Sequence, residues 1–149
     1  MAKIVDLQNK RTPLGIRLCN PLNMERTGIE WHGLTPIQKH KRFCEFHTLE
    51  YGWRAAIINI CITYRQRGWD TIEKIISHWA PQSENNTKKY IQYVCNKTGI
   101  LPDKQLASYK TNRQQYFDVL TAMAYYEQGP EWINAIVKDR LVKAFDHLM

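Results

Sequence analysis

The sequence lacks the patterns by which several common protein classes are recognised. No apolar run approaches the roughly 18 residues that a membrane helix needs, so we expect no membrane-spanning helix and do not predict a membrane as the partner. The first ten residues have no apolar core of the kind found in signal peptides, which argues against export through the secretory pathway. There is also no GxSxG motif, phosphate loop or dinucleotide fingerprint. These absences argue against a serine hydrolase and a nucleotide-binding enzyme.

Cysteine and histidine are present but are not spaced for metal binding. The four cysteines are far apart with no CxxC pair, and the five histidines include no HExxH pattern. We therefore expect no metal ion and no cofactor. We interpret the cysteines as reduced thiols, most of them buried.

Basic residues exceed acidic ones, giving a net charge of +7 and a pI near 9.3. Such a charge favours an anionic partner, which could be nucleic acid, anionic lipid or the carboxylate-rich bacterial cell wall. Helices expected near 71–79 and 86–98 could be read as a helix-turn-helix, but the connection containing Pro81 is long for that motif. Nucleic acid is therefore the weaker candidate.

The length and composition predict one mainly α-helical domain over residues 1–149. With 44% hydrophobic and 23% charged residues, the chain can bury a core and is neither disordered nor fibrous. Proline and glycine interrupt every periodic run in residues 1–42, which predicts a loop-rich region with at most a short β-hairpin near 28–31 and 42–46. Residues 43–149 should form the helical body.

One segment should organise the helical body. Residues 43–47 alternate apolar and polar side chains as a short strand does, and from Thr48 the spacing becomes helical. Thr48 is the expected N-cap and Gly68 the expected end of this helix. The apolar side chains extend most of the way round it, which is typical of a buried central helix. They include Leu49, Trp53, Ala56, Ile57, Ile60, Cys61 and Tyr64.

Four further helices are expected after the central one. The expected N-caps are Asp70, then Asn85 or Asn86, then Thr111 in a capping box with Gln114. The second of these helices should end at Gly99, and the third at Gly129-Pro130. The last helix should carry an apolar face that begins at Trp132.

Glu127 is the carboxylate that the pattern singles out. It continues the apolar stripe of Leu120 and Met123, and it lies in the last helical turn, where a negative charge opposes the helix dipole. Both features suit a carboxyl whose pKa is raised by an apolar pocket, as a general acid requires. The alternative is a solvated glutamate at a frayed helix end. Glu45 and Glu50 are rival candidates, although Glu50 in a first helical turn has a sufficient structural explanation.

Aromatic side chains could stack on sugars or on nucleic-acid bases. Core packing accounts for Trp53, Trp79 and Trp132, which fall on helix faces. Trp31 lies in a glycine-bounded loop and is the tryptophan we expect to face a ligand.

Several segments together resemble a family of small phage and prophage proteins that are common in gut Bacteroides-type genomes. The matching segments are 11–17, 20–24, 31–33, 43–46, 50–55, 71–76, 79–81, 84–87, 90–91 and 122–129. Members of this family are usually described as virion structural or endolysin-like proteins. The sequence departs from the family pattern at Leu18 and Cys19, where asparagines are usual, and at Met24 and Glu25, where isoleucine and arginine are usual.

The resemblance implies a lysozyme-like fold. The asparagine-proline loop resembles the substrate loop of glucosaminidases and lytic transglycosylases, and the alanine-rich helix ending at Glu127 resembles their catalytic-glutamate helix. The two elements occur here in the reverse order, which a circular permutation would reconcile.

The hypothesis is therefore a phage-encoded peptidoglycan-degrading protein that acts at the bacterial cell wall from the host cytoplasm or the virion. Glu127 would be the general acid, and Asn20, Asn23 and Trp31 would bind the glycan. The alternative is a non-enzymatic virion protein that binds the wall or other virion proteins. The bond cleaved and the oligomeric state are left open.

Overall fold

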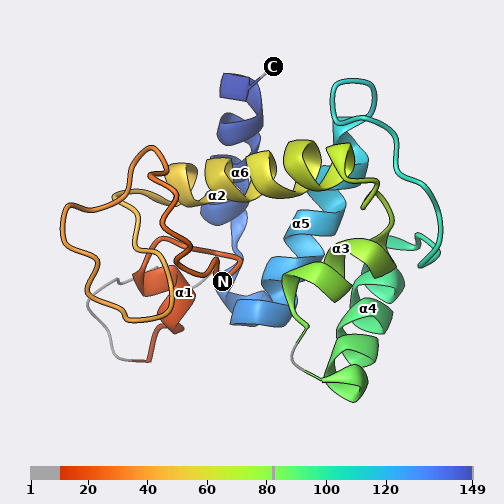
Figure 1. Ribbon diagram of the computed structural model, residues 1–149, viewed down its shortest axis with the longest axis horizontal. Helices are drawn as coiled ribbons and strands as arrows, with labels where there is room; N and C mark the ends of the chain where they lie inside the picture. The colour runs from red at the N-terminus through yellow and green to blue at the C-terminus, as the bar shows by residue number, and fades with distance from the viewer. Residues whose placement is uncertain (1–10, 82, 149) are drawn as a thin grey trace.

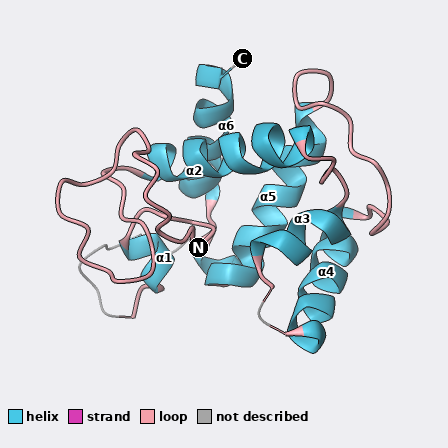
Figure 2. Ribbon diagram, viewed as in Figure 1, coloured by secondary structure: helices cyan, strands magenta, loops and turns pink. Residues whose placement is uncertain are grey.

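The computed structural model describes residues 11–81 and 83–148 and confirms a mainly α-helical fold (Figures 1 and 2). Its α-helices are α1 (Leu14–Arg17), α2 (Leu49–Ile57), α3 (Ile72–Trp79), α4 (Glu84–Thr98), α5 (Arg113–Gln128) and α6 (Ala135–Leu148). A π-helix, Ile58–Tyr64, continues α2 without a break, and a 3₁₀ turn, Pro130–Trp132, separates α5 from α6.

The segment between α1 and α2 is a long loop region, which lies on the left in Figure 2. The strand expected at 43–47 does not form, because pairing in the described chain is limited to isolated antiparallel bridges, Glu25 with Phe43 and Leu34 with Phe46. Cys44 and Phe46 are nevertheless buried. The alternation in the sequence therefore reflects alternating burial of an extended segment rather than a sheet. The expected loop-rich region also contains one short helix, α1, that the sequence did not indicate.

The central helix forms where the sequence predicts it. Thr48 is its N-cap, and the hydroxyl accepts a hydrogen bond from the backbone N–H of Tyr51 at 3.3 Å. α2 packs chiefly on α6, which crosses behind it in Figure 1. Trp53 is fully buried at this crossing, and its indole N–H donates to the backbone carbonyl of Val137 at 3.0 Å.

α5 is the second buried helix and the one that carries Glu127. It packs on α4 and also contacts α1 and α6, so elements from both ends of the chain meet on it. Val119, Leu120 and Met123 have no exposed surface. The helix ends at Gln128, as the Gly129-Pro130 signal predicts, so Glu127 lies in its last turn.

Several expected helix starts are wrong by a few residues. Thr71 rather than Asp70 caps α3, and Ser83 rather than Asn85 or Asn86 caps α4; each hydroxyl accepts from a backbone N–H three residues on. The capping box at Thr111 does not form, because α5 begins at Arg113 and the Gln114 amide donates to Asp118. The last helix begins at Ala135, so Trp132 lies in the preceding 3₁₀ turn.

The cysteines agree with their interpretation as reduced thiols. All four are free, and Cys19, Cys44 and Cys61 are buried. Within residues 11–81 and 83–148, none of the helices combines the length and the apolar character needed to span a bilayer.

Candidate active site

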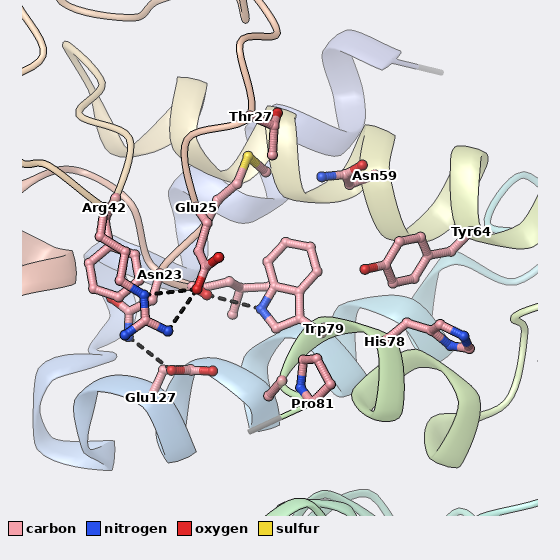
Figure 3. A pocket seen from close by; sticks show the side chains of 14 residues that line it. Asn23, Glu25, Thr27, Arg42, Asn59, Tyr64, His78, Trp79, Pro81 and Glu127 are labelled. Atoms are coloured by element: carbon pink, nitrogen blue, oxygen red, sulfur yellow. Dashed lines mark hydrogen bonds and ion pairs between the residues drawn. The ribbon is translucent and has the colours of Figure 1, made fainter. Parts of the chain in front are cut away.

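A cleft of about 230 Å³ lies where the loop region meets the helical body (Figure 3). Its lining comes from four places: loop segments 22–27 and 42–43, the π-helix, the end of α3 with the residues after it, and the last turn of α5. In Figure 3 Glu127 and Asn23 lie toward one end of the cleft, Tyr64 and His78 toward the other, and Trp79 lies between them.

Glu127 is held at this cleft by two uncharged donors. The Asn23 amide nitrogen donates to Oε1 at 2.9 Å, and the Tyr90 hydroxyl donates to Oε2 at 2.9 Å. Tyr90 is buried, and its ring stacks on Tyr126 with centroids 4.1 Å apart. Burial and the neighbouring Glu127 raise the pKa of Tyr90 well above its ordinary value, so this hydroxyl remains a neutral donor.

Gln128 fixes the orientation of Asn23. Its Nε2 donates to the Asn23 Oδ1 at 2.9 Å and to the backbone carbonyl of Pro21 at 3.0 Å. With Oδ1 used in this way, the amide nitrogen of Asn23 is directed to Glu127. Asn23 has φ +54°, a left-handed conformation that asparagine tolerates better than most residues. Gly15 gives the network its space, because a Cβ there would collide with Gln128 Nε2 and Asn23 Oδ1.

The environment of Glu127 favours its protonated form. Burial raises the pKa of the Glu127 carboxyl, while the hydrogen bonds from Asn23 and Tyr90 and the charge of Arg42 act in the lowering direction without cancelling the rise. Each carboxyl oxygen has two lone pairs, so the two hydrogen bonds leave room for a proton. A raised pKa of this kind is the property that a general acid requires.

The other side chains that line the cleft include an exposed ion pair and a tryptophan. Glu25 also lines the cleft, but its side chain is 57% exposed and it pairs with Arg42 at 2.7 Å. Trp79 forms part of the wall, and its indole N–H donates to the backbone carbonyl of Leu22 at 3.0 Å. An aromatic wall with a fixed orientation is suited to packing against the C–H face of a sugar ring.

The proposed glycan-binding residues lie in different surroundings. Asn23 lines the cleft beside Glu127. Asn20 is 1% exposed, and its amide bonds the backbone of Met24 and the carbonyl of Cys44, so in this position it shapes the loop that carries Asn23. Trp31 is half-buried and packs against the hydrophobic core, outside the lining of the cleft.

The rival carboxylates, Glu45 and Glu50, are also outside the lining of the cleft. Glu50 pairs with His147 of α6 at 2.7 Å. Glu45 has one buried carboxylate oxygen without a hydrogen-bond partner among the described residues. Neither is placed with Glu127.

Sequence reasoning did not identify four members of this site: Tyr90, Gln128, Tyr64 and Asn59. Tyr64 lies on the apolar stripe of the central helix and Tyr90 on that of the helix expected near 86–98, and such a stripe gives no sign of where a tyrosine hydroxyl bonds. The partner of the Tyr90 hydroxyl is 37 residues away. Trp79 was explained by core packing, although its wall position leaves it half-buried.

No cluster of three or more His, Cys, Asp or Glu side chains suited to a metal ion occurs in the described ranges. No protein-family model matches the chain. Over 136 residues, however, it is 38% identical to Protein P5 of Pseudoalteromonas phage PM2, and this match covers 89% of the chain and 79% of the phage protein.

Proposed function

The chain belongs to the family of bacteriophage proteins represented by Protein P5 of phage PM2, and from this premise we propose that it degrades peptidoglycan by general acid catalysis. Glu127 is the acid in this proposal, and the bond cleaved is a glycosidic bond of the glycan strand. The reaction is that of a glycosidase or lytic transglycosylase, on a lysozyme-like and circularly permuted arrangement of helices.

The observation that carries the proposal is the state of Glu127. Cleavage of a glycosidic bond requires a proton on the leaving oxygen, and a carboxyl with a raised pKa retains that proton closer to neutral pH. Burial supplies the rise in pKa, and Asn23 and Tyr90 hold the carboxyl in one orientation. A surface glutamate at a helix end would have neither property.

The rest of the cleft suits a glycan. Trp79 offers an indole face to a sugar ring, and Asn23 offers an amide beside the acid. Asn20 holds the loop that carries Asn23. Trp31 lies outside the cleft and binds a part of the glycan strand that extends beyond the cleft. The net charge of +7 holds the protein on the anionic wall. One acid/base residue is sufficient for a transglycosylase-type reaction, which is the form we favour.

The departures at Leu18 and Cys19 do not weaken the proposal. Leu18 is 9% and Cys19 4% exposed, so side chains at these positions would not contact sugar. Cys19 also has φ +54°, which asparagine adopts more readily than most residues. The usual asparagine at position 19 is therefore explained by the backbone conformation rather than by glycan binding.

The test is release of soluble muropeptides from purified Gram-negative sacculi. We expect Glu127→Gln to reduce release by about 100- to 10,000-fold, the usual contribution of a general acid. The amide keeps the shape of the side chain, can accept from Asn23 and can donate to Tyr90. Glu131→Gln is the matched control, because it removes one negative charge from an exposed glutamate outside the cleft lining. Circular dichroism establishes that each variant is folded.

Wild-type release retained by Glu127→Gln would move the acid to Glu45 or Glu50. Absence of release by folded wild type on several wall types would contradict the enzyme and support the alternative, a non-enzymatic virion component.

A further inference from the structure

The π-helix places two residues on the cleft that an α-helix would separate. Asn59 and Tyr64 are five residues apart within Ile58–Tyr64, and both line the cleft. At about 100° per residue, positions five apart in an α-helix point roughly 140° away from each other. The i to i+5 hydrogen bonds of a π-helix instead bring such positions to the same side. In Figure 3 the two residues project from the same helix beside Trp79.

Asn59 contributes an unused amide. Among the described residues its side chain has no hydrogen-bond partner, although it is half-buried. The other asparagine of the cleft, Asn23, has both ends of its amide bonded. No other side chain in the described ranges competes for this amide, and it is not among the buried polar atoms that lack a partner, so it is open to the cleft and available to a ligand. The amide offers one acceptor and two donors to such a ligand.

The aromatic side chains next to Asn59, those of Trp79 and Tyr64, are held in place by contacts with other rings. Tyr64 meets Trp79 edge-on, with centroids 6.1 Å apart, and meets Trp69 edge-on at 4.9 Å. Trp69 in turn stacks on His78 with centroids 3.5 Å apart and planes 8° apart. Because the rings are supported, the wall can pack against a sugar with little loss of side-chain freedom.

We propose that Asn59 is the specificity-determining residue of the cleft and pairs with the acetamido group of an N-acetylated hexosamine packed on Trp79 and Tyr64. The inference rests on the proposed function in taking the ligand to be a glycan. An acetamido group presents one carbonyl and one N–H, which an asparagine amide can bond together. A deacetylated amino sugar has no carbonyl to accept from the Asn59 amide, so one of the two hydrogen bonds cannot form.

The test compares two tetrasaccharides by isothermal titration calorimetry on the full chain carrying Glu127→Gln, which prevents turnover. The ligands are the tetramer of N-acetylglucosamine and the tetramer of glucosamine. We expect the acetylated tetramer to bind at least tenfold more tightly. Adding Asn59→Ala should weaken its binding by about five- to tenfold, the effect of losing hydrogen bonds between the side chain and the ligand.

Asn96→Ala is the matched control, since Asn96 is an exposed asparagine of α4 outside the cleft lining, and it should leave binding unchanged. Asn59→Asp is the second variant; it keeps the shape but loses both donors, and we expect the same loss of acetyl preference. Equal or absent binding of the two tetramers, or equal affinities for the Asn59 and Asn96 variants, would overturn the inference.

The binding measurements and the muropeptide assay distinguish a failure of the role of Asn59 from a failure of the role of Glu127. Acetyl-selective binding by a protein that releases no muropeptides would contradict the role of Glu127 and support that of Asn59. Release that depends on Glu127 without acetyl selectivity would contradict Asn59 alone.

Discussion

The cleft carries two glutamates with different surroundings: Glu127 in its less exposed part, which we call the floor, and Glu25 at its rim. Glu127 is half-buried and accepts from two neutral donors, whereas Glu25 is exposed and pairs with a guanidinium. The two neutral donors and the charge of Arg42, which pairs directly with Glu25, lower the pKa of Glu127 only in part, so burial still raises it. Two identical side chains can therefore take different roles within one cleft.

A large effect is expected from displacing Gln128 and Asn23, the residues that position Glu127. Gly15→Ala introduces a methyl group that collides with Gln128 and Asn23 and lies 2.7 Å from the backbone carbonyl of Asn20. We expect a loss of about 1–3 kcal/mol in the free energy of unfolding, measured by urea denaturation, together with loss of muropeptide release.

Gly28→Ala is the control for that variant. Its methyl group would meet nothing within 4 Å, so only the strain of φ +85° is added. Release by Gly15→Ala equal to that of Gly28→Ala would show that the Gln128–Asn23 contact does not position the acid.

A second variant removes one of the two neutral hydrogen-bond donors to Glu127. Tyr90→Phe deletes the hydroxyl that donates to Glu127, at a cost of about 1 kcal/mol of stability. That hydrogen bond lowers the pKa of Glu127, so its loss raises the pKa further. A general acid fails when it loses its proton, and the alkaline limb of the pH profile of release should therefore move to higher pH.

Tyr93→Phe supplies the reference for this shift, because Tyr93 lies on the same helix and its hydroxyl bonds no residue of the described chain. An alkaline limb that stays in place, or moves to lower pH, in Tyr90→Phe would contradict the assigned role of the Tyr90 hydroxyl.

The smallest effect is expected at the rim. Glu25→Gln breaks an ion pair whose two side chains are 50% and 57% exposed, and such pairs contribute under about 1 kcal/mol. Thermal unfolding should change little, and muropeptide release should remain near the wild-type level. A loss of release as large as that of Glu127→Gln would mean that both carboxyls take part, as in glycosidases with paired acids, and the division between floor and rim would be wrong.

The helices could be predicted because their signals are local. The apolar stripes, the cap at Thr48 and the stop at Gly129 each depend on residues within a few positions of one another. Cap positions were less certain, since Asp70 and Thr71 are both suitable and the choice depends on packing beyond the turn. The π-helix was not predicted, because Ile58–Tyr64 has the same apolar spacing as the α-helix before it.

The site could be predicted only in part. Glu127 was identifiable because its charge lies on an apolar stripe at an unfavourable helix end. Its partners come from 104 and 37 residues away in the chain, at Asn23 and Tyr90, and no local pattern joins them. Asn23 is suggested by the family resemblance, whereas Tyr90 fits an apolar helix stripe and carries no sign of a role in the site. Whether each residue has its proposed role stays a prediction.

The most direct test of the central claim is a ¹³C NMR titration of the glutamate side-chain carboxyls, with the Glu127 signal assigned by its absence in Glu127→Gln. We expect Glu127 to lose its proton at a higher pH than the ordinary value for glutamate, because burial raises its pKa. Titration of Glu127 at or below that ordinary value would contradict the assignment of Glu127 as a carboxyl with a raised pKa.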